Sequence, residues 1–273
     1  MIETILIATD GSDAAHHAER YGVALGSRLR ARLAGLAVIE DKVAQGLRAD
    51  ALGITPPNLD GIEGFLKARA EAACRRLSDA ARSSQSECAA EAVRGIADDR
   101  IVERGQAVDM VVIGRDGEHA GCRTGLIGST ADGTLRKTGK AVVVVPAGSE
   151  FGGPIVLAFD GSPGSRVAAK LAVELAARLE QTVHVFVDSK DKGRAAARFD
   201  EVRRLLGTLT VPVREASSTL GRPDVKIVDT ARAARAGLIV MGAFGRNRIN
   251  EYFLGSNASA VVRTSPVPVL LAR

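Results

Sequence analysis

The residues that could do chemistry in this chain are two aspartates and two sets of spaced glycines. Asp10 and Asp160 each follow a short apolar run, and each is followed by Gly-Ser. Glycine permits positive φ angles and lets a ligand approach the backbone closely, so a loop between glycines can surround a phosphate with N–H groups. The stretch 241–257, MGAFGRNRINEYFLGSN, contains such a loop and ends in Gly255, Ser256 and Asn257.

These residue types are suited to holding an anion beside a hydroxyl-bearing group. Free N–H groups at the start of a helix near 256 favour a phosphate, and the Ser256 side chain can add a hydrogen bond. Arg246 supplies positive charge. Asp160 is poorly placed for a phosphate but suited to accept from a ribose hydroxyl or to hold a metal ion. A nucleotide would use all of these groups; the alternative is that Gly255 and Ser256 form only a tight turn and a cap.

The chain contains this pattern twice. ILIATDGSDAAHHAERYGVALGSRL from Ile5 and IVLAFDGSPGSRVAAKLAVELAARL from Ile155 both run from an apolar strand through Asp-Gly-Ser into an Ala/Leu-rich helix. GSTADGTLRKTGKAVVVV likewise corresponds to GSNASAVVRTSPVPVLLA. A repeat of this length predicts two domains, 1–147 and 152–273, joined by the Pro/Gly/Ser-rich stretch PAGSEFGGP.

Each half alternates strands with helices, which predicts the α/β class with a parallel sheet and right-handed crossovers. We expect strands at 4–9, 33–39, 89–93, 109–114, 141–145, 154–159, 182–187, 211–216, 237–242 and 267–271. We expect helices at 13–30, 61–83, 97–106, 129–138, 163–179, 191–207, 223–235 and 256–264. The first half has an additional segment, 40–64, which we interpret as a loop or flap.

In open parallel sheets, ligands bind beyond the carboxyl ends of the strands, where the strand order reverses. Asp160 ends the first strand of its half and Gly242 ends the fourth. If these strands are neighbours, both features border one crevice. No G-x-G-x-x-G follows either first strand, so a dinucleotide-binding fold is disfavoured.

Both halves resemble the universal stress protein family, in a tandem form. The second half matches that family's ATP-binding signature Gly-x2-Gly-x9-Gly-Ser/Thr at Gly242, Gly245, Gly255 and Ser256. The resemblance implies two open parallel five-stranded sheets in the order 3-2-1-4-5, with helices on both faces, in an adenine nucleotide alpha hydrolase-like fold. It also implies ATP as the cofactor, with or without Mg²⁺, and does not identify any other metal ion.

The resemblance also implies which residues bind the nucleotide. Asp160 would hold the ribose, and Phe186 would meet adenine through its backbone. The predicted binding residues of the second half are Ala158, Phe159, Asp160, Phe186, Met241, Gly242, Gly245, Arg246, Gly255, Ser256 and Asn257. Those of the first half are Asp10, Val38, Gly114, Gly117, Gly128, Ser129 and Thr130.

The first half departs from the signature. Ten residues, rather than nine, separate Gly117 from Gly128, and the loop carries Asp116 and Glu118 where the second half has Phe and Arg. Two carboxylates near a triphosphate repel it unless a cation intervenes. We therefore expect the second site to bind ATP more tightly, and the first to be weak, metal-dependent or differently selective.

The sequence favours some partners over others. Family members pair through their last strands, so the resemblance implies that 141–145 and 267–271 meet in a pseudo-dimer, with a homodimer as a further option; such pairing seals an exposed edge. The net charge is +5, but the arginines are spread along the chain, which argues against DNA. The apolar runs are too short to span a membrane. The three widely spaced cysteines and the lack of a signal peptide favour the cytoplasm.

Three functions follow as hypotheses. The first is an ATP-dependent regulatory module in a stress response. The second is a slow ATPase or nucleotidyl-transferring enzyme, although the sequence offers no nucleophile–base pair and no catalytic residue is predicted. The third is a scaffold that has lost nucleotide binding, against which the intact signature in the second half argues.

Overall fold

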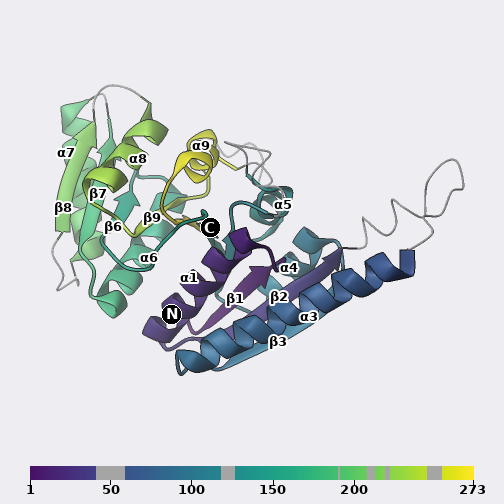
Figure 1. Cartoon of the computed structure of the whole chain (residues 1–273). Helices are drawn as coiled ribbons and strands as arrows, with labels where there is room; N and C mark the ends of the chain where they lie inside the picture. The colour runs from purple at the N-terminus through teal and green to yellow at the C-terminus, as the bar shows by residue number, and fades with distance from the viewer. Residues whose placement is uncertain (41–58, 118–126, 190, 208–212, 219–221, 245–253) are drawn as a thin grey trace, which may run out of the picture.

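The computed structural model contains all 273 residues and describes them except for 41–58, 118–126, 190, 208–212, 219–221 and 245–253 (Figure 1). The first half contains β1 (Thr4–Thr9), α1 (Asp13–Leu29), β2 (Arg32–Glu40), α3 (Leu59–Ser83), β3 (Cys88–Gly95), α4 (Ala97–Gly105), β4 (Met110–Gly114), α5 (Ser129–Lys137) and β5 (Ala141–Val145). The second contains β6 (Ile155–Ala158), α6 (Pro163–Leu179), β7 (Val183–Asp188), α7 (Lys192–Leu206), β8 (Val213–Ser218), α8 (Pro223–Ala233), β9 (Leu238–Gly242), α9 (Ser256–Thr264) and β10 (Val269–Ala272). These elements follow the predicted alternation.

The strands form one sheet of ten, in the order β3-β2-β1-β4-β5-β10-β9-β6-β7-β8. Each half therefore has the expected order 3-2-1-4-5, and the strand pairs within each half are parallel. The two half-sheets join where β5 and β10 pair antiparallel, with Val144 opposite Val269. The expected meeting of the last strands is thus observed, and it merges two sheets into one.

The strands are apolar because both faces of the sheet are covered by helices. Ile5 and Ile7 face the layer that contains α1 and α6, whereas Leu6 and Ala8 face the layer that contains α4, α5, α8 and α9. Each apolar cluster contains residues of both halves. The core is therefore continuous across the β5–β10 junction.

The first helix of each half begins in the same way. The Ser12 side chain accepts from the Ala15 N–H, and the Ser162 side chain accepts from the Ser165 N–H, each at 3.2 Å. These N-caps satisfy donors that the first helical turn leaves without partners. They place both Asp-Gly-Ser turns at the carboxyl ends of the central strands β1 and β6.

The predicted loop at 40–64 is too long at both ends. β2 continues through Glu40, and α3 already begins at Leu59. The helix extends because Leu66, Ala70 and Ala73 pack against the apolar face of β2. Residues 41–58 lie outside the described part of the chain.

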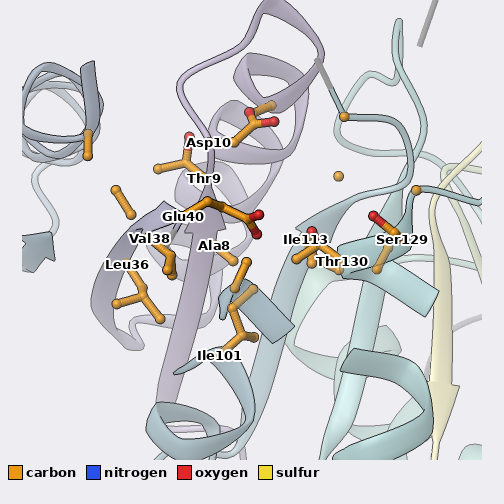
Figure 2. Close-up of a pocket in the computed structure, with 18 of the residues that line it drawn as sticks. Ala8, Thr9, Asp10, Leu36, Val38, Glu40, Ile101, Ile113, Ser129 and Thr130 are labelled. Carbon is orange, nitrogen blue, oxygen red and sulfur yellow. The ribbon is translucent and has the colours of Figure 1, made fainter. Parts of the chain in front are cut away.

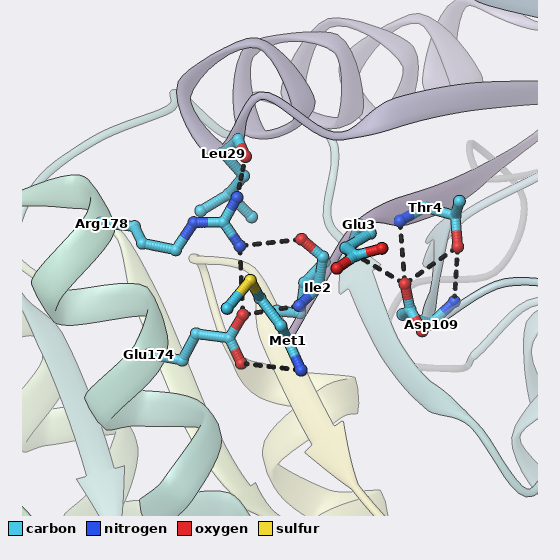
Figure 3. A network of polar contacts seen from close by, with 8 residues as sticks. All are labelled: Met1, Ile2, Glu3, Thr4, Leu29, Asp109, Glu174 and Arg178. Atoms are coloured by element: carbon cyan, nitrogen blue, oxygen red, sulfur yellow. Dashed lines mark hydrogen bonds and ion pairs between the residues drawn. The ribbon is translucent and has the colours of Figure 1, made fainter.

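A polar network also joins the halves at the amino end of β1 (Figure 3). Glu174 on α6 accepts from the Ile2 N–H at 2.6 Å. Arg178 donates to the Ile2 carbonyl at 2.8 Å and to the Leu29 carbonyl at the end of α1. No helix in the described ranges has the length and apolar character that a membrane span requires.

Candidate functional site

Two crevices lie at equivalent places, where the carboxyl ends of the central strands meet the first turn of the last helix of each half. The larger is in the first half and has a volume of about 600 Å³ (Figure 2). Small-molecule sites typically measure about 300–1,000 Å³. All of the binding residues predicted for this half line the crevice, namely Asp10, Val38, Gly114, Gly117, Gly128, Ser129 and Thr130.

The walls of the first crevice combine an apolar side with polar groups. Leu36, Val38 and Ile101 supply the apolar side, and the carboxylates of Asp10 and Glu40 face the same space (Figure 2). A flat apolar group such as a purine can pack against aliphatic side chains, while hydroxyls can donate to carboxylates. The arrangement is thus suited to a nucleoside-like ligand.

Asp10 is held in place by its own turn. Its Oδ1 accepts from the Ser12 N–H at 2.9 Å and from the Ser12 hydroxyl at 2.6 Å. Gly11, with a φ of +76°, allows the chain to turn there. A Cβ placed on Gly117 would lie 3.7 Å from Oδ2 of Asp10, so the glycine loop passes beside that oxygen. Oδ2 is therefore positioned to accept from a ligand hydroxyl.

A partly buried ion pair between α1 and α3 supports this turn. The Thr9 hydroxyl accepts from the Gly11 N–H at 3.1 Å and donates to Glu19. Glu19 is only 3% exposed, and Arg76 contacts it with Nε at 3.0 Å and Nη2 at 2.6 Å. This fork neutralises the buried carboxylate. The network links α1 and α3 to the Asp10 turn.

The amino end of α5 is open toward the crevice. Gly128 is the N-cap and makes no side-chain capping bond. Its own N–H donates to the Arg115 carbonyl at 2.8 Å, which fixes where the helix begins. The next amides lack helical partners and, with the helix dipole, favour an anion. The Ser129 hydroxyl is directed at the same space (Figure 2).

Asp116 does not enter the first crevice as a free negative charge. Arg115 contacts it through Nε, 3.1 Å from each carboxylate oxygen, and through Nη2 at 3.0 Å. The expected repulsion between this loop and a triphosphate is weaker as a result, because the neighbouring Arg115 supplies a cation next to Asp116. The other acid of the loop, Glu118, lies outside the described residues.

The second crevice is much smaller, about 130 Å³ within the described part of the chain. It brings together most of the predicted residues of its half, namely Ala158, Phe159, Asp160, Phe186, Met241, Gly242, Gly255, Ser256 and Asn257. Gly245 and Arg246 lie outside the described residues. Asp160 repeats the geometry of Asp10, because its Oδ1 accepts from the Ser162 N–H at 2.9 Å.

Two details refine the predicted roles in this half. The Phe186 carbonyl accepts from the Phe159 N–H at 2.9 Å, so one of its two acceptor positions is already used. A Cβ on Gly242 would lie 2.8 Å from the Gly164 carbonyl carbon and 2.9 Å from the Ser165 nitrogen. Gly242 is therefore required by the close approach of α6 to β9, independently of any phosphate.

Arg273 borders the second crevice without lining it. Its guanidinium stacks on the ring of Phe244, 4.7 Å from the ring centroid. Its Nε and Nη2 are buried and have no hydrogen-bond partner among the described residues. Burial lowers the pKa of this guanidinium. The stacking against Phe244 partly compensates for the lost hydration.

Sequence reasoning missed several residues of the first crevice. Glu40 lies two residues beyond Val38, and Asp188 lies two beyond Phe186, so an acid at the same position of both repeats was the available signal. The Glu40 side chain makes no hydrogen bond or ion pair with another described residue, so its carboxylate could contact a ligand in the crevice. Arg69 comes from α3, for which no motif gave a signal.

Metal ligands do not cluster in the part of the chain that the structure describes. No group of three or more His, Cys, Asp or Glu side chains there could hold a metal ion. In proteins that bind nucleotides, Mg²⁺ is commonly bound by the phosphates of the substrate together with one or two carboxylates of the protein. Asp10 and Glu40 are the carboxylates of the first crevice that could serve in this way.

The chain is an α/β protein whose open sheet has a crevice at the point where the strand order reverses, which is where proteins of this class bind ligands; here the unit is duplicated. The universal stress protein family is matched over residues 1–146 and 153–273. The chain therefore belongs to the universal stress protein family and carries two of its domains in tandem.

Individual relatives agree with this assignment. A universal stress protein of Mycolicibacterium smegmatis is 30% identical over 84% of this chain and 74% of its own length. The universal stress protein Slr1230 of Synechocystis is 22% identical over the full length of both chains. The crystal structure of a universal stress protein from Archaeoglobus fulgidus superimposes with a TM-score of 0.78 at 18% identity, covering 99% of this chain and 98% of that one.

Proposed function

We propose that this protein is a cytoplasmic regulatory module that binds an adenine nucleotide, ATP with or without Mg²⁺, and changes its assembly or contacts in response. The observation that carries the proposal is the first crevice. There Asp10, an apolar wall and the open amino end of α5 surround a volume of about 600 Å³. The base would lie against Val38 and Leu36, the ribose at Asp10, and a phosphate at Ser129 and Thr130.

The second half supports the proposal in a different way. It keeps the unbroken glycine spacing of the ATP-binding signature, and its helix α9 also begins without a side-chain cap. Its described crevice, about 130 Å³, is below the usual volume of about 300–1,000 Å³ for small-molecule sites, so we expect Phe186 or Phe244, which line it, to move when a nucleotide binds. Tighter binding of the triphosphate in this half remains a prediction from the sequence.

The test begins with the purified full-length protein. Denaturation followed by chromatography should release an adenine nucleotide, and added ATP should raise the melting temperature of nucleotide-free protein. A ligand at 100 times its Kd stabilises by about 2.7 kcal/mol. No released nucleotide, together with no thermal shift from ATP, ADP or AMP, would refute the proposal.

A matched pair of glycine variants assigns the site. Gly117→Val places a branched side chain 3.7 Å from Oδ2 of Asp10, inside the first crevice. Gly139→Val makes the same change where a Cβ meets no atom within 4 Å. Calorimetric titration should show that Gly117→Val removes one bound nucleotide per chain while Gly139→Val removes none. Unchanged stoichiometry in Gly117→Val would place the ligand elsewhere.

A further inference from the structure

Arg115 connects the first crevice to the second half of the molecule. It follows β4, lines the crevice and holds Asp116 through Nε. Its Nη1 donates to the carbonyl of Ser265 at 2.8 Å and to that of Arg263 at 3.3 Å. The Arg115 side chain is 19% exposed and that of Asp116 is 15% exposed, so their ion pair is largely shielded from water. The bond to Ser265 is partly buried, and the bond to Arg263 lies at the surface.

The two carbonyls belong to the carboxyl end of α9, whose amino end borders the second crevice. Ser256 and Asn257, at the start of the helix, line that crevice. A helix of this length extends about 13 Å at 1.5 Å per residue. A cation at its carboxyl end and an anion at its amino end both interact favourably with the helix dipole. One short rigid element thus contacts the groups of both crevices.

The backbone of Arg115 carries the link into the first crevice. Its N–H donates to the Val145 carbonyl at 2.8 Å, and its carbonyl accepts from the Gly128 N–H at 2.8 Å. Gly128 is the N-cap of α5. A displacement of Arg115 therefore moves Asp116 and the amino end of α5 together.

The second half has no counterpart of this side chain. Ala243 occupies the position of Arg115 and repeats only its backbone bonds, with its N–H on the Ala272 carbonyl and its carbonyl accepting from Gly255 at 2.9 Å each. The first crevice thus contacts α9 through a side chain, and among the described residues no equivalent arginine extends from the second crevice to α5.

We propose that Arg115 is a positioning residue of the first crevice that α9 holds in place, and that it couples the two crevices. Filling the second crevice shifts or stiffens α9, which changes how Arg115 presents Asp116 and Gly128 to a ligand. Coupling between equilibrium binding sites is reciprocal, so filling the first crevice changes the affinity of the second by the same factor. The coupling rests on the proposed nucleotide binding; the positioning role does not.

The coupling is measured with variants that block one crevice each. Ser129→Asp and Ser256→Asp place a carboxylate at the first position of α5 and of α9, which suits the helix dipole but repels a phosphate. If the sites are independent, ATP titration of the wild-type protein equals the sum of the two single-site titrations. If the sites are coupled, the stepwise Kd values of the wild-type protein should differ by about fivefold or more from those that the two single-site titrations predict.

Arginine variants identify the path. ATP titration of Arg115→Met should equal the sum of the two single-site titrations. Arg115→Lys, which keeps the charge but loses the planar fork, should show only part of the wild-type deviation from that sum. Arg178→Met is the matched control, because Arg178 also bridges the halves but lies at the amino end of β1 (Figure 3). It should leave the coupling unchanged.

A ligand-free measurement separates the two claims. In the absence of nucleotide, hydrogen exchange at the Gly128 amide should accelerate in Arg115→Met and not in Arg178→Met. If this occurs but no nucleotide binds, the proposed function and the coupling fail while the positioning role stands. If nucleotide binds and the wild-type titration equals the sum, or Arg115→Met keeps the difference, the coupling is overturned. Unchanged exchange in Arg115→Met overturns the positioning role.

Discussion

The two crevices share one backbone plan and differ in what fills them. Both lie where the strand order reverses, beside an Asp-Gly-Ser turn and the open end of a short helix. The second has aromatic rings where the first has smaller or polar side chains: Phe159 for Thr9, Phe186 for Val38, and Phe244 for Asp116. The volumes are about 130 and 600 Å³. Duplication thus preserved the positions, and a few side chains decided the space.

The support beneath the crevices differs as well. In the first half, Thr9, Glu19 and Arg76 form a buried polar network. In the second half, Phe159 replaces Thr9 and Ala169 replaces Glu19, and both are buried in the apolar cluster. A polar network costs desolvation but fixes geometry. The comparison suggests that the first Asp-Gly-Ser turn is held by hydrogen bonds and the second by apolar packing.

The largest expected effect comes from breaking this network. Arg76→Met leaves Glu19 charged and nearly buried, which typically costs about 3–5 kcal/mol; we expect the lower end because the Arg76 side chain is 37% exposed. Urea denaturation measures the loss. The double variant Glu19→Leu/Arg76→Met imitates the apolar second half and should be more stable than Arg76→Met alone. A double variant as unstable as the single one would contradict the comparison.

Opening the second crevice should have the next largest effect. Phe186 is 3% exposed, and Phe186→Val removes most of a buried ring, at an expected cost of about 2–3 kcal/mol. The same change should strengthen nucleotide binding in this half, because it creates the space that Val38 leaves in the first. Titration in the Ser129→Asp background isolates that site. Unchanged affinity there would show that Phe186 does not limit access.

Closing the first crevice is the reciprocal experiment. Val38→Phe introduces the residue found at the equivalent position of the second half. The additional ring would occupy the space of the ligand, and overpacking of this size should weaken nucleotide binding by about 1–3 kcal/mol, or roughly 5- to 150-fold in Kd. Calorimetric titration in the Ser256→Asp background measures it. Val167→Phe, at a valine on α6 that is 37% exposed, is the matched control and should bind normally. If Val38→Phe leaves the Kd for nucleotide unchanged, the ligand does not lie against the apolar side of the first crevice.

The smallest expected effect is the pH dependence that Asp109 contributes in the first half. Burial alone would raise the pKa of Asp109, but hydrogen bonds from the Glu3 N–H and from the Thr4 hydroxyl and N–H, each at 2.9 Å, outweigh it and hold the pKa below its usual value (Figure 3). The stabilisation is present above the unfolded-state pKa and is lost as the pH falls through the folded-state pKa.

Asp109→Asn should therefore reduce the acid sensitivity of the free energy of unfolding, by at most about 1 kcal/mol because the site is exposed. Denaturant melts over an acidic pH series measure it. Asp79→Asn, at a side chain that is 68% exposed and paired with Arg82, is the control. In the second half the equivalent strands, β6 and β9, are joined at this end by the Gly237 N–H and the Pro154 carbonyl, which do not titrate. An Asp109→Asn variant with wild-type acid sensitivity would contradict this assignment.

Much of the fold follows from local pattern. The apolar runs, the Asp-Gly-Ser turns and the serine caps each act within a few residues, so the order and approximate bounds of the elements were predictable. The resemblance to a known family supplied the strand order. The start of α3 was predicted to within two residues, at 61 instead of Leu59, but its first turns were also assigned to the loop 40–64, because they are largely exposed and carry a weak apolar pattern, with Phe65 64% exposed. Their helical conformation depends on packing against β2 through Leu66 and Ala70.

The sequence by itself determined the duplication, the α/β class and the position of a crevice at each Asp-Gly-Ser turn, because these depend on residue types and short spacings. Only the tertiary structure decided which crevice is open and what Arg115 contacts. Cavity volume depends on side chains from several strands and helices, and Arg115 reaches Ser265, 150 residues along the chain. Such contacts arise when β5 and β10 join the halves, and no local spacing in the sequence encodes them.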